Sequence, residues 1–244
     1  MDRRGFSLIE MLVGLTISFF VILAALECFG LTRDLFLKIK NAEEETQAAA
    51  VALDKIRIDL LRAGSGLVDP ISQGTIEGAA SDGNILLVYR LDEAFALGAD
   101  ILSGDSEAVL AAAITVSSGL RPGREICLSC ENHSECRIIS ACAGNTVVLS
   151  APLEFLYLQD DSRLLLLEKT TIYLDETSRT LRRKVNASSP QPLMDGVASF
   201  ECGCDPESKL ARAGFVPADN QEKKYEIWVL PKNLALARNV GPAE

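Results

Sequence analysis

Basic charge is scarce in this sequence and is never clustered. The 244 residues include 24 lysines and arginines against 34 aspartates and glutamates, for a formal net charge of −10. A surface that binds a nucleic-acid backbone needs gathered Lys and Arg side chains, so the sequence argues against nucleic acid as a partner. Hydrophobic residues make up 48% of the chain, too large a share for a disordered protein. The composition therefore predicts a globular domain with a sizeable core.

Catalytic motifs are also absent. The chain has a single histidine, His133. It lacks a Gly-x-Ser-x-Gly elbow, a Walker loop, a dinucleotide-binding fingerprint and a His-Glu-x-x-His pair, which are the patterns that position nucleophiles, phosphates and catalytic zinc. We therefore expect no enzymatic activity, no cofactor and no metal.

Charge is nearly missing from the N-terminal segment. Between Phe6 and Leu26 the one ionisable side chain is Glu10, and a run this long and apolar crosses a bilayer as a helix. Arg3 and Arg4 precede the run, and basic residues keep the adjacent end of a membrane helix in the cytoplasm. We expect a single-pass membrane protein whose body lies outside the cytoplasm.

Ordinary secretory signals fit this segment poorly. No small-x-small site for signal peptidase precedes a polar segment near Cys28. A lipoprotein signal needs a small residue before its cysteine, and Glu27 occupies that position. An uncleaved signal anchor remains an alternative.

The start of the apolar run carries a specific motif. The residues Gly5-Phe6-Ser7-Leu8-Ile9-Glu10-Met11-Leu12-Val13 closely resemble the cleavage and methylation motif of type IV prepilins. The resemblance implies that a prepilin peptidase removes residues 1–5 by cutting between Gly5 and Phe6. It also implies that the new amine of Phe6 is methylated and that Glu10 is retained for subunit assembly.

Glu10 also has a physical rationale of its own. A carboxylate within an apolar segment is costly and is tolerated where it has a partner or a function. In a filament of staggered parallel helices, the charged N-terminus of an incoming subunit can pair with Glu10 of its neighbour, which would set the subunit register. The alternative is a glutamate that only snorkels to the membrane edge.

The helical pattern continues past the transmembrane half, residues 6–31. Residues 32–64 contain apolar and small residues spaced alternately four and three apart, the pattern of a helix with one buried face. This seam comprises Leu35, Ile39, Ala42, Thr46, Ala49, Leu53, Ile56 and Leu60. A cation followed by glycines at residues 62–66 predicts the end of the helix. In pilins the second half of one long helix packs on a sheet, and this half matches that requirement.

Residues 65–244 have short apolar runs separated by Gly, Asp, Asn and Pro, which predicts β-strands. Candidate strands cover 85–91, 108–116, 125–129, 137–141, 146–149, 164–174, 180–185, 197–202 and 225–230. Residues 169–174 and 180–184 are expected to form a hairpin. We therefore predict an α+β, pilin-like fold in which one long N-terminal helix packs on a predominantly antiparallel β head.

Three segments resemble the PilW-type minor pilins. They are Asp59-Leu60-Leu61-Arg62-Ala63-Gly64, Gly83-Asn84-Ile85-Leu86-Leu87-Val88-Tyr89 and Leu193-Met194-Asp195-Gly196-Val197. The J-type minor pseudopilins of type II secretion share the long helix, the β head and a late Gly-Val strand. The resemblance therefore leaves these two subfamilies open.

Six cysteines lie in the expected head. They are Cys127, Cys130, Cys136, Cys142, Cys202 and Cys204. Thiols outside the cytoplasm are usually oxidised, so we expect a cross-linked excursion near 127–142 and disulfides that use all six cysteines. Six cysteines allow fifteen pairings, among which the spacing does not choose. A zinc site that includes His133, or a thioredoxin-like redox pair, is the competing interpretation.

The leading functional hypothesis is a minor pilin that acts in type IV pilus assembly, in an initiating or tip complex. Its expected partners are other minor and major pilins, the prepilin peptidase and methyltransferase, and the assembly platform of the bacterial inner membrane. The expected location is the inner membrane, with a periplasmic head, and then the pilus. The alternatives are a minor pseudopilin of type II secretion and a membrane-anchored periplasmic metal or redox protein.

Overall fold

The computed structural model describes residues 8–205, 208 and 210–231. The chain divides into two units, residues 1–48 and residues 49–244. The helix α1 (Leu8–Leu61) crosses this division, so its last residues belong to the second unit.

The described part of the first unit is helical throughout. Within the described residues, α1 is the one helix that is long and apolar enough to cross a membrane, with a mean hydropathy of 2.4 in its most apolar window. The hydroxyls of Thr16 and Ser18 donate to the carbonyls of Val13 and Gly14 at 2.9 and 2.8 Å. These bonds satisfy both hydroxyls inside the apolar segment. Length and composition thus agree with membrane anchoring.

The second unit is predominantly β. Besides α1, the described residues form a short helix α2 (Val68–Ser72), a 3₁₀ turn η1 (Val116–Ser118) and strands β1 to β12. The strands are β1 (Ala79–Asp82), β2 (Ile85–Ala96), β3 (Glu107–Val109), β4 (Glu125–Ser129), β5 (Ser134–Ala143), β6 (Thr146–Leu149), β7 (Arg163–Asp175), β8 (Thr180–Val185), β9 (Gln191–Met194), β10 (Val197–Cys204), β11 (Ala211–Pro217) and β12 (Tyr225–Val229).

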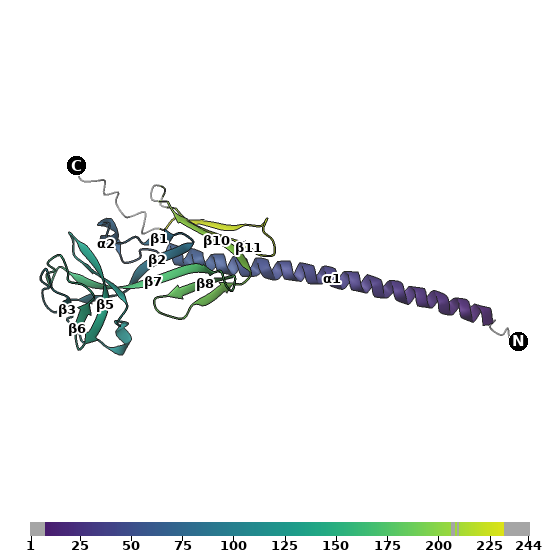
Figure 1. Ribbon diagram of the computed structural model, residues 1–244, viewed down its shortest axis with the longest axis horizontal. Helices are drawn as coiled ribbons and strands as arrows, with labels where there is room; N and C mark the ends of the chain where they lie inside the picture. Colours follow the sequence, from purple (N-terminus) through teal and green to yellow (C-terminus); the bar gives the residue numbers. More distant parts are fainter. Residues whose placement is uncertain (1–7, 206–207, 209, 232–244) are drawn as a thin grey trace. The chain divides into compact units, whose positions relative to one another are not determined.

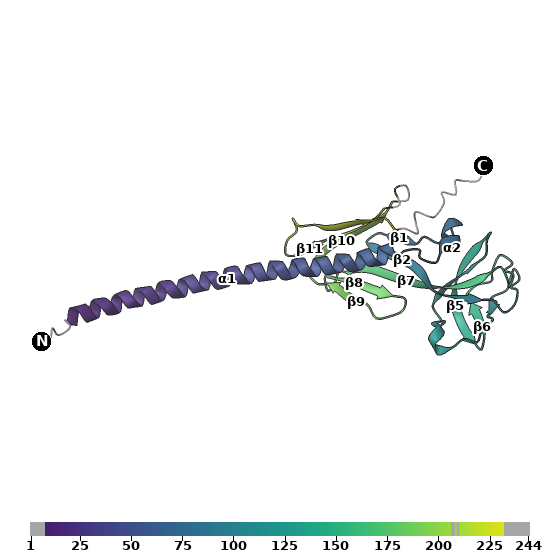
Figure 2. The same ribbon diagram turned by 180° about the vertical axis from the view of Figure 1, so that it is seen from behind.

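The strands form two sheets, and each pairing in the described chain is antiparallel. The larger sheet has nine strands, with β1-β2-β7-β4-β5-β6-β3 in order and β8-β9 added beside β7. The long strand β7 pairs with β4 through its first residues and with β8 through its last. In consequence β8 lies toward one end of β7 and β5 and β6 lie toward the other (Figure 1, Figure 2). The smaller sheet has the order β10-β11-β12.

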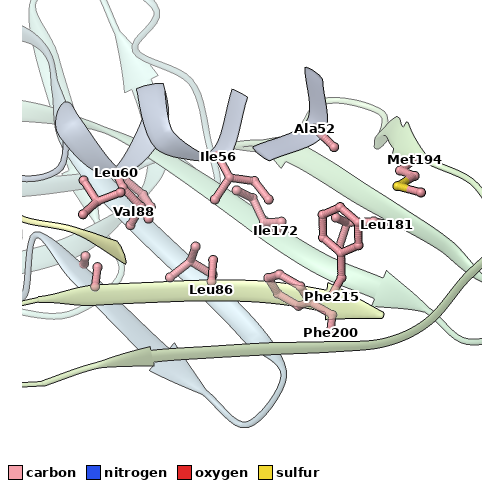
Figure 3. Close-up of a cluster of buried hydrophobic side chains, with 14 of the residues drawn as sticks. Ala52, Ile56, Leu60, Leu86, Val88, Ile172, Leu181, Met194, Phe200 and Phe215 are labelled. Atoms are coloured by element: carbon pink, nitrogen blue, oxygen red, sulfur yellow. The ribbon is translucent and has the colours of Figure 1, made fainter. Parts of the chain in front are cut away.

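The last turns of α1 pack on both sheets. Ile56 and Leu60 are fully buried, and they point toward strand residues that include Ile172 and Val88 (Figure 3). Phe200 of β10 and Phe215 of β11 complete this cluster from the smaller sheet. Full burial of one such aliphatic side chain contributes about 1.5–3 kcal/mol. The predicted α+β fold, with a long helix packed on an antiparallel β head, is confirmed.

A buried ion pair also joins α1 to the larger sheet. Arg183 of β8 donates two hydrogen bonds to the carboxylate of Asp59, at 2.6 and 2.9 Å. The side chains of Asp59 and Arg183 are only 8% and 12% exposed. Beside them, Arg90 of β2 donates to both oxygens of Glu168 on β7, each at 2.7 Å. These charges are paired with bidentate geometry, which offsets the cost of burying them.

The glycine-rich turn after α1 sits against β2. The amide of Gly64 donates to the carbonyl of Tyr89 and the amide of Leu91 to that of Ser65, at 2.7 and 2.9 Å. Gly66 has φ +75°, and a Cβ there would lie 2.7 Å from the Leu91 side chain. Glycine is therefore required by backbone conformation and by space, and the predicted helix end is confirmed within three residues.

Most candidate strands are confirmed, but the candidate strand at 108–116 is wrong. Only Glu107–Val109 forms β3, and a 3₁₀ turn begins at Val116. Residues 111–113 are three exposed alanines, which have too little apolar surface to hold a strand on the sheet. The expected hairpin of residues 169–174 and 180–184 is present as β7 and β8.

Candidate functional site

The exposed apolar surface of α1 is the main feature of the first unit. Ile9, Met11 and Phe20 are 72%, 72% and 69% exposed. Such a long exposed apolar surface indicates a segment that is covered by lipid or by other chains. Glu10 lies in this surface, in the first turn of the described helix, and its side chain is exposed.

The predicted processing residues, Gly5 and Phe6, lie outside the described residues. Cleavage between them, methylation of Phe6 and the assembly role of Glu10 therefore stay predictions.

The predicted seam in residues 32–64 behaves differently in the two units. Leu35 and Ile39 are 60% and 66% exposed, whereas Ala49 and Ile56 are fully buried. Leu53 packs at the edge of the same cluster as Ile56. Only the part of the seam from residue 49 onward therefore packs on the sheets, and the earlier part keeps its apolar residues exposed.

The six head cysteines occupy three separate places. Cys127 and Cys136 pack in one cluster with Leu67 and Leu165. Cys130 and Cys142 pack at the edge of a second cluster, and Cys202 and Cys204 at the edge of the cluster beneath α1. All six are free thiols in this structure. The disulfides expected from the sequence stay a prediction, and residues 127–142 belong to the β4–β5 hairpin of the sheet, with residues 130–133 in its turn.

Burial also changes the chemistry of the pair on β10. It raises the pKa of both Cys202 and Cys204 to about 11, because a thiolate is disfavoured away from water. Both thiols therefore stay protonated at neutral pH.

His133 contacts a backbone carbonyl, one thiol and two aromatic rings. Its Nε2 donates to the carbonyl of Leu156 at 3.1 Å, and its Nδ1 lies 3.5 Å from the sulfur of Cys130. Its ring centroid lies 4.5 Å from that of Phe155 and 4.9 Å from that of Tyr157. Across the described ranges, no three His, Cys, Asp or Glu side chains gather as a metal site would require.

Glu135 is a buried carboxylate that sequence analysis missed. It accepts hydrogen bonds from the amides of Glu154 and Phe155 at 3.0 and 2.9 Å, from the hydroxyl of Tyr157 at 3.3 Å, and from Arg137 at 2.6 Å. Burial, followed by the charge of Glu135, raises the pKa of Tyr157. Glu135 therefore ties β5 to the segment around residue 155. No sequence signal marks it, because its donors other than Arg137 lie 19 to 22 residues away.

Comparison with known proteins identifies the N-terminal motif. Residues 1–26 match the family model of the prokaryotic N-terminal methylation motif. No curated protein sequence matches the chain.

Likenesses to solved structures are local. The tailspike of Pseudomonas phage phi297 shares 17% identity and a TM-score of 0.27 over 32% of this chain and 14% of that one. The tailspike of Acinetobacter baumannii bacteriophage AP22, solved with a capsular saccharide, shares 17% identity and a TM-score of 0.27 over 33% of this chain and 15% of that one. The endosialidase of phage phi92 shares 11% identity and a TM-score of 0.20 over 59% of this chain and 32% of that one. The chain thus spans less than a third of the length of each of these proteins, and such low scores do not establish a shared fold.

The methylation motif indicates a type IV pilin or pseudopilin family member. Such a motif is typical of structural rather than catalytic proteins, and it implies other pilins and a prepilin peptidase as partners. The apolar helix agrees with an anchored subunit.

Proposed function

We propose that this chain is a minor pilin, a structural subunit that takes part in the initiation or tip complex of a type IV pilus. The observation that carries the proposal is the methylation motif at the start of a helix with an exposed apolar surface. The motif supplies processing at the membrane, and the helix supplies the surface through which subunits associate. The head contributes contacts and no chemistry.

Glu10 is the proposed assembly contact. Cleavage after Gly5 would leave a charged amine on Phe6, one helical turn from Glu10 in the sequence. In hydrocarbon both charges are costly when alone. The amine of one subunit paired with Glu10 of its neighbour removes that cost and favours one stagger between parallel helices.

The exposed part of the seam offers a second surface for subunit contacts. Leu35, Phe36 and Ile39 are 60%, 63% and 66% exposed. They follow the apolar run and precede the buried residues of the head cluster. In a filament these side chains would be covered by the helices of neighbouring subunits, which would stabilise the assembly through apolar burial.

The assignment to a minor pilin rests on the three PilW-like segments. Leu60 and Ala63 come from the first segment, Leu86 and Val88 from the second, and Val197 from the third, and all five are in one core cluster. Segments far apart in the sequence that meet in one core support a shared architecture better than three isolated matches do. A J-type minor pseudopilin is the alternative, because Gly196 immediately precedes β10 and Val197 is the first residue of that strand.

Mass spectrometry of the mature N-terminus tests the processing step. We expect a chain that begins at a methylated Phe6. An intact Met1, or cleavage near Cys28, would show that the chain is not processed as a prepilin. Deletion of the gene then separates the two subfamilies, because loss of surface pili supports the pilus and loss of protein secretion with normal pili supports the pseudopilus.

Substitution of Glu10 tests the assembly contact. We expect Glu10→Val to insert into the membrane normally but to be poorly recovered in sheared filaments, because the incoming amine loses its partner. Glu27→Val is the matched control, since it removes the same charge from the same helix farther along. Equal recovery of the Glu10 variant and the wild type would show that this charge pair is dispensable.

A further inference from the structure

The cysteines Cys127 and Cys136 lie directly opposite each other in the β4–β5 hairpin. The register of the two strands pairs their Cα atoms. Their side chains emerge on the same face of the sheet, where both pack with Leu67 and Leu165. Cys127 is fully buried and Cys136 is partly exposed.

The hydrogen-bond pattern shows which kind of strand position they occupy. At one end of the hairpin the amide of Cys130 donates to the carbonyl of His133, and at the other the amide of Ile139 donates to that of Arg124, at 3.0 and 2.9 Å. Hydrogen-bonded and non-hydrogen-bonded pairs alternate along antiparallel strands. Counting inward from either end places Cys127 and Cys136 in a non-hydrogen-bonded pair.

That position suits a covalent bond between the two sulfurs. Cα atoms in a non-hydrogen-bonded pair are about 4.5 Å apart and their side chains are close. A disulfide spans Cα separations of roughly 4.4–6.8 Å. The backbone therefore needs no large movement to join them.

The two thiols already interact. Each thiol shifts the pKa of the other through its proximity: the pKa of Cys136 is lowered and that of Cys127 is raised. Burial adds to the rise at Cys127. Cys136, the more exposed of the two, is thus the better nucleophile.

The other head cysteines are not placed to compete for this bond. Cys130 follows β4 and packs at the edge of the cluster on the other face, with its sulfur 3.5 Å from His133. Cys142 lies opposite Val147 of β6. Cys202 and Cys204 lie on β10, in the smaller sheet.

We propose that Cys127 and Cys136 form a cross-strand disulfide in the native protein. The oxidising compartment that this requires rests on the proposed function, which places the head in the periplasm. The choice of pair rests on the strand register alone. The bond would tie β4 to β5 at a point where β4 also pairs with β7.

The oxidant is a disulfide-bearing oxidase of that compartment or an oxidised small thiol. The thiolate of Cys136 attacks one sulfur of the oxidant disulfide, which forms a mixed disulfide and releases one oxidant thiolate. The thiolate of Cys127 then attacks the Cys136 sulfur and releases the second oxidant thiolate. The two released thiolates take up the two protons lost by the cysteines, so two electrons pass to the oxidant.

The test uses the full-length protein purified in detergent. Protein alkylated with iodoacetamide at lysis reports the state in the cell. A second sample is fully reduced, equilibrated under native conditions with oxidised glutathione, and then alkylated in denaturant. Residues 125–137 form one tryptic peptide that contains Cys127, Cys130 and Cys136. Further cleavage after Glu131 and Glu135 separates Cys136, and fragment ions then locate the bridge.

We expect Cys127 linked to Cys136 in both samples. The link should persist in Cys130→Ser and disappear in Cys136→Ser, which is its matched variant. Free Cys127 and Cys136 after equilibration with glutathione, or a predominant link from either to another cysteine, would overturn the proposal. So would a reduced pair at lysis in chains whose N-terminus begins at Phe6.

The same samples separate this inference from the proposed function. A chain with an intact Met1 whose Cys127 and Cys136 still join in glutathione would remove the prepilin assignment and support the pairing. A chain processed at Phe6 whose two thiols do not join would support the prepilin assignment and remove the pairing.

Discussion

The ion pair between Asp59 and Arg183 allows a sharp test of how α1 is held on the head. Asp59→Asn keeps the size of the side chain and removes its charge. Arg183 would keep its charge with its side chain only 12% exposed. Removal of one partner from a buried pair costs about 3–5 kcal/mol, because the remaining charge is left uncompensated. We therefore expect Asp59→Asn to lower the free energy of unfolding of the second unit by about this amount.

The same helix offers a matched control. Asp54 lies 3.9 Å from Arg57, and both side chains are more than 60% exposed. Exposed pairs contribute about 0–1 kcal/mol, so Asp54→Asn should change little. The two variants carry the same substitution and the same change in net charge, and they differ mainly in burial.

Pulse proteolysis of the full-length protein in urea measures the difference. With a urea dependence of about 2–3 kcal/mol per molar for a unit of this size, the expected loss corresponds to a midpoint lower by about 1–2.5 M for Asp59→Asn. A shift in Asp59→Asn no larger than that in Asp54→Asn would refute the reasoning. It would mean that apolar packing alone holds the helix on the sheets.

Three further predictions follow from burial. Glu135→Gln should lower the free energy of unfolding by about 3 kcal/mol, because Arg137 keeps a buried charge. The Glu154 side chain is 77% exposed and lies 3.8 Å from the same arginine, so Glu154→Gln should lower it by less than about 1 kcal/mol. Similar urea midpoints for the two variants would contradict this. Ile56→Ala should lower the free energy of unfolding by about 2–5 kcal/mol. Val51 is 69% exposed, so Val51→Ala should change it by no more than about 0.5 kcal/mol. An equal loss in the two variants would place Ile56 outside the core. In the reduced, folded protein, the alkylation rates of Cys202 and Cys204 should rise with pH with a midpoint near pH 11, against 9 for an unperturbed thiol. The reason is that burial disfavours the thiolate. A midpoint near pH 9 would show that both thiols are solvated.

Local patterns in the sequence account for most of the elements. The turn between β7 and β8 and the breakers after α1 were both readable, because turn chemistry and apolar spacing act over a few residues. Three strands were missed. β1 is a short polar segment, β9 contains Pro192 on an edge strand, and β11 buries mainly small residues around Gly214. Such residues give little strand signal, and only pairing with neighbouring strands makes them β.

The candidate site was only partly predictable. The methylation motif and Glu10 are contiguous in the sequence, so reading them needs no tertiary structure. The role of Glu135 was not readable, because a glutamate in a polar stretch is normally a solvated residue. Its burial depends on donors from the segment near residue 155, which the fold brings to β5.

The sequence by itself determined a methylation motif, an apolar helix that follows the motif, and a head rich in β-strands. Those features depend on residues that are neighbours along the chain. Tertiary structure decided which part of the helix seam is buried, that Asp59 meets Arg183 across 124 residues, and which cysteine faces which. Those outcomes depend on strand register and on contacts between distant segments, and spacing along the chain does not encode them.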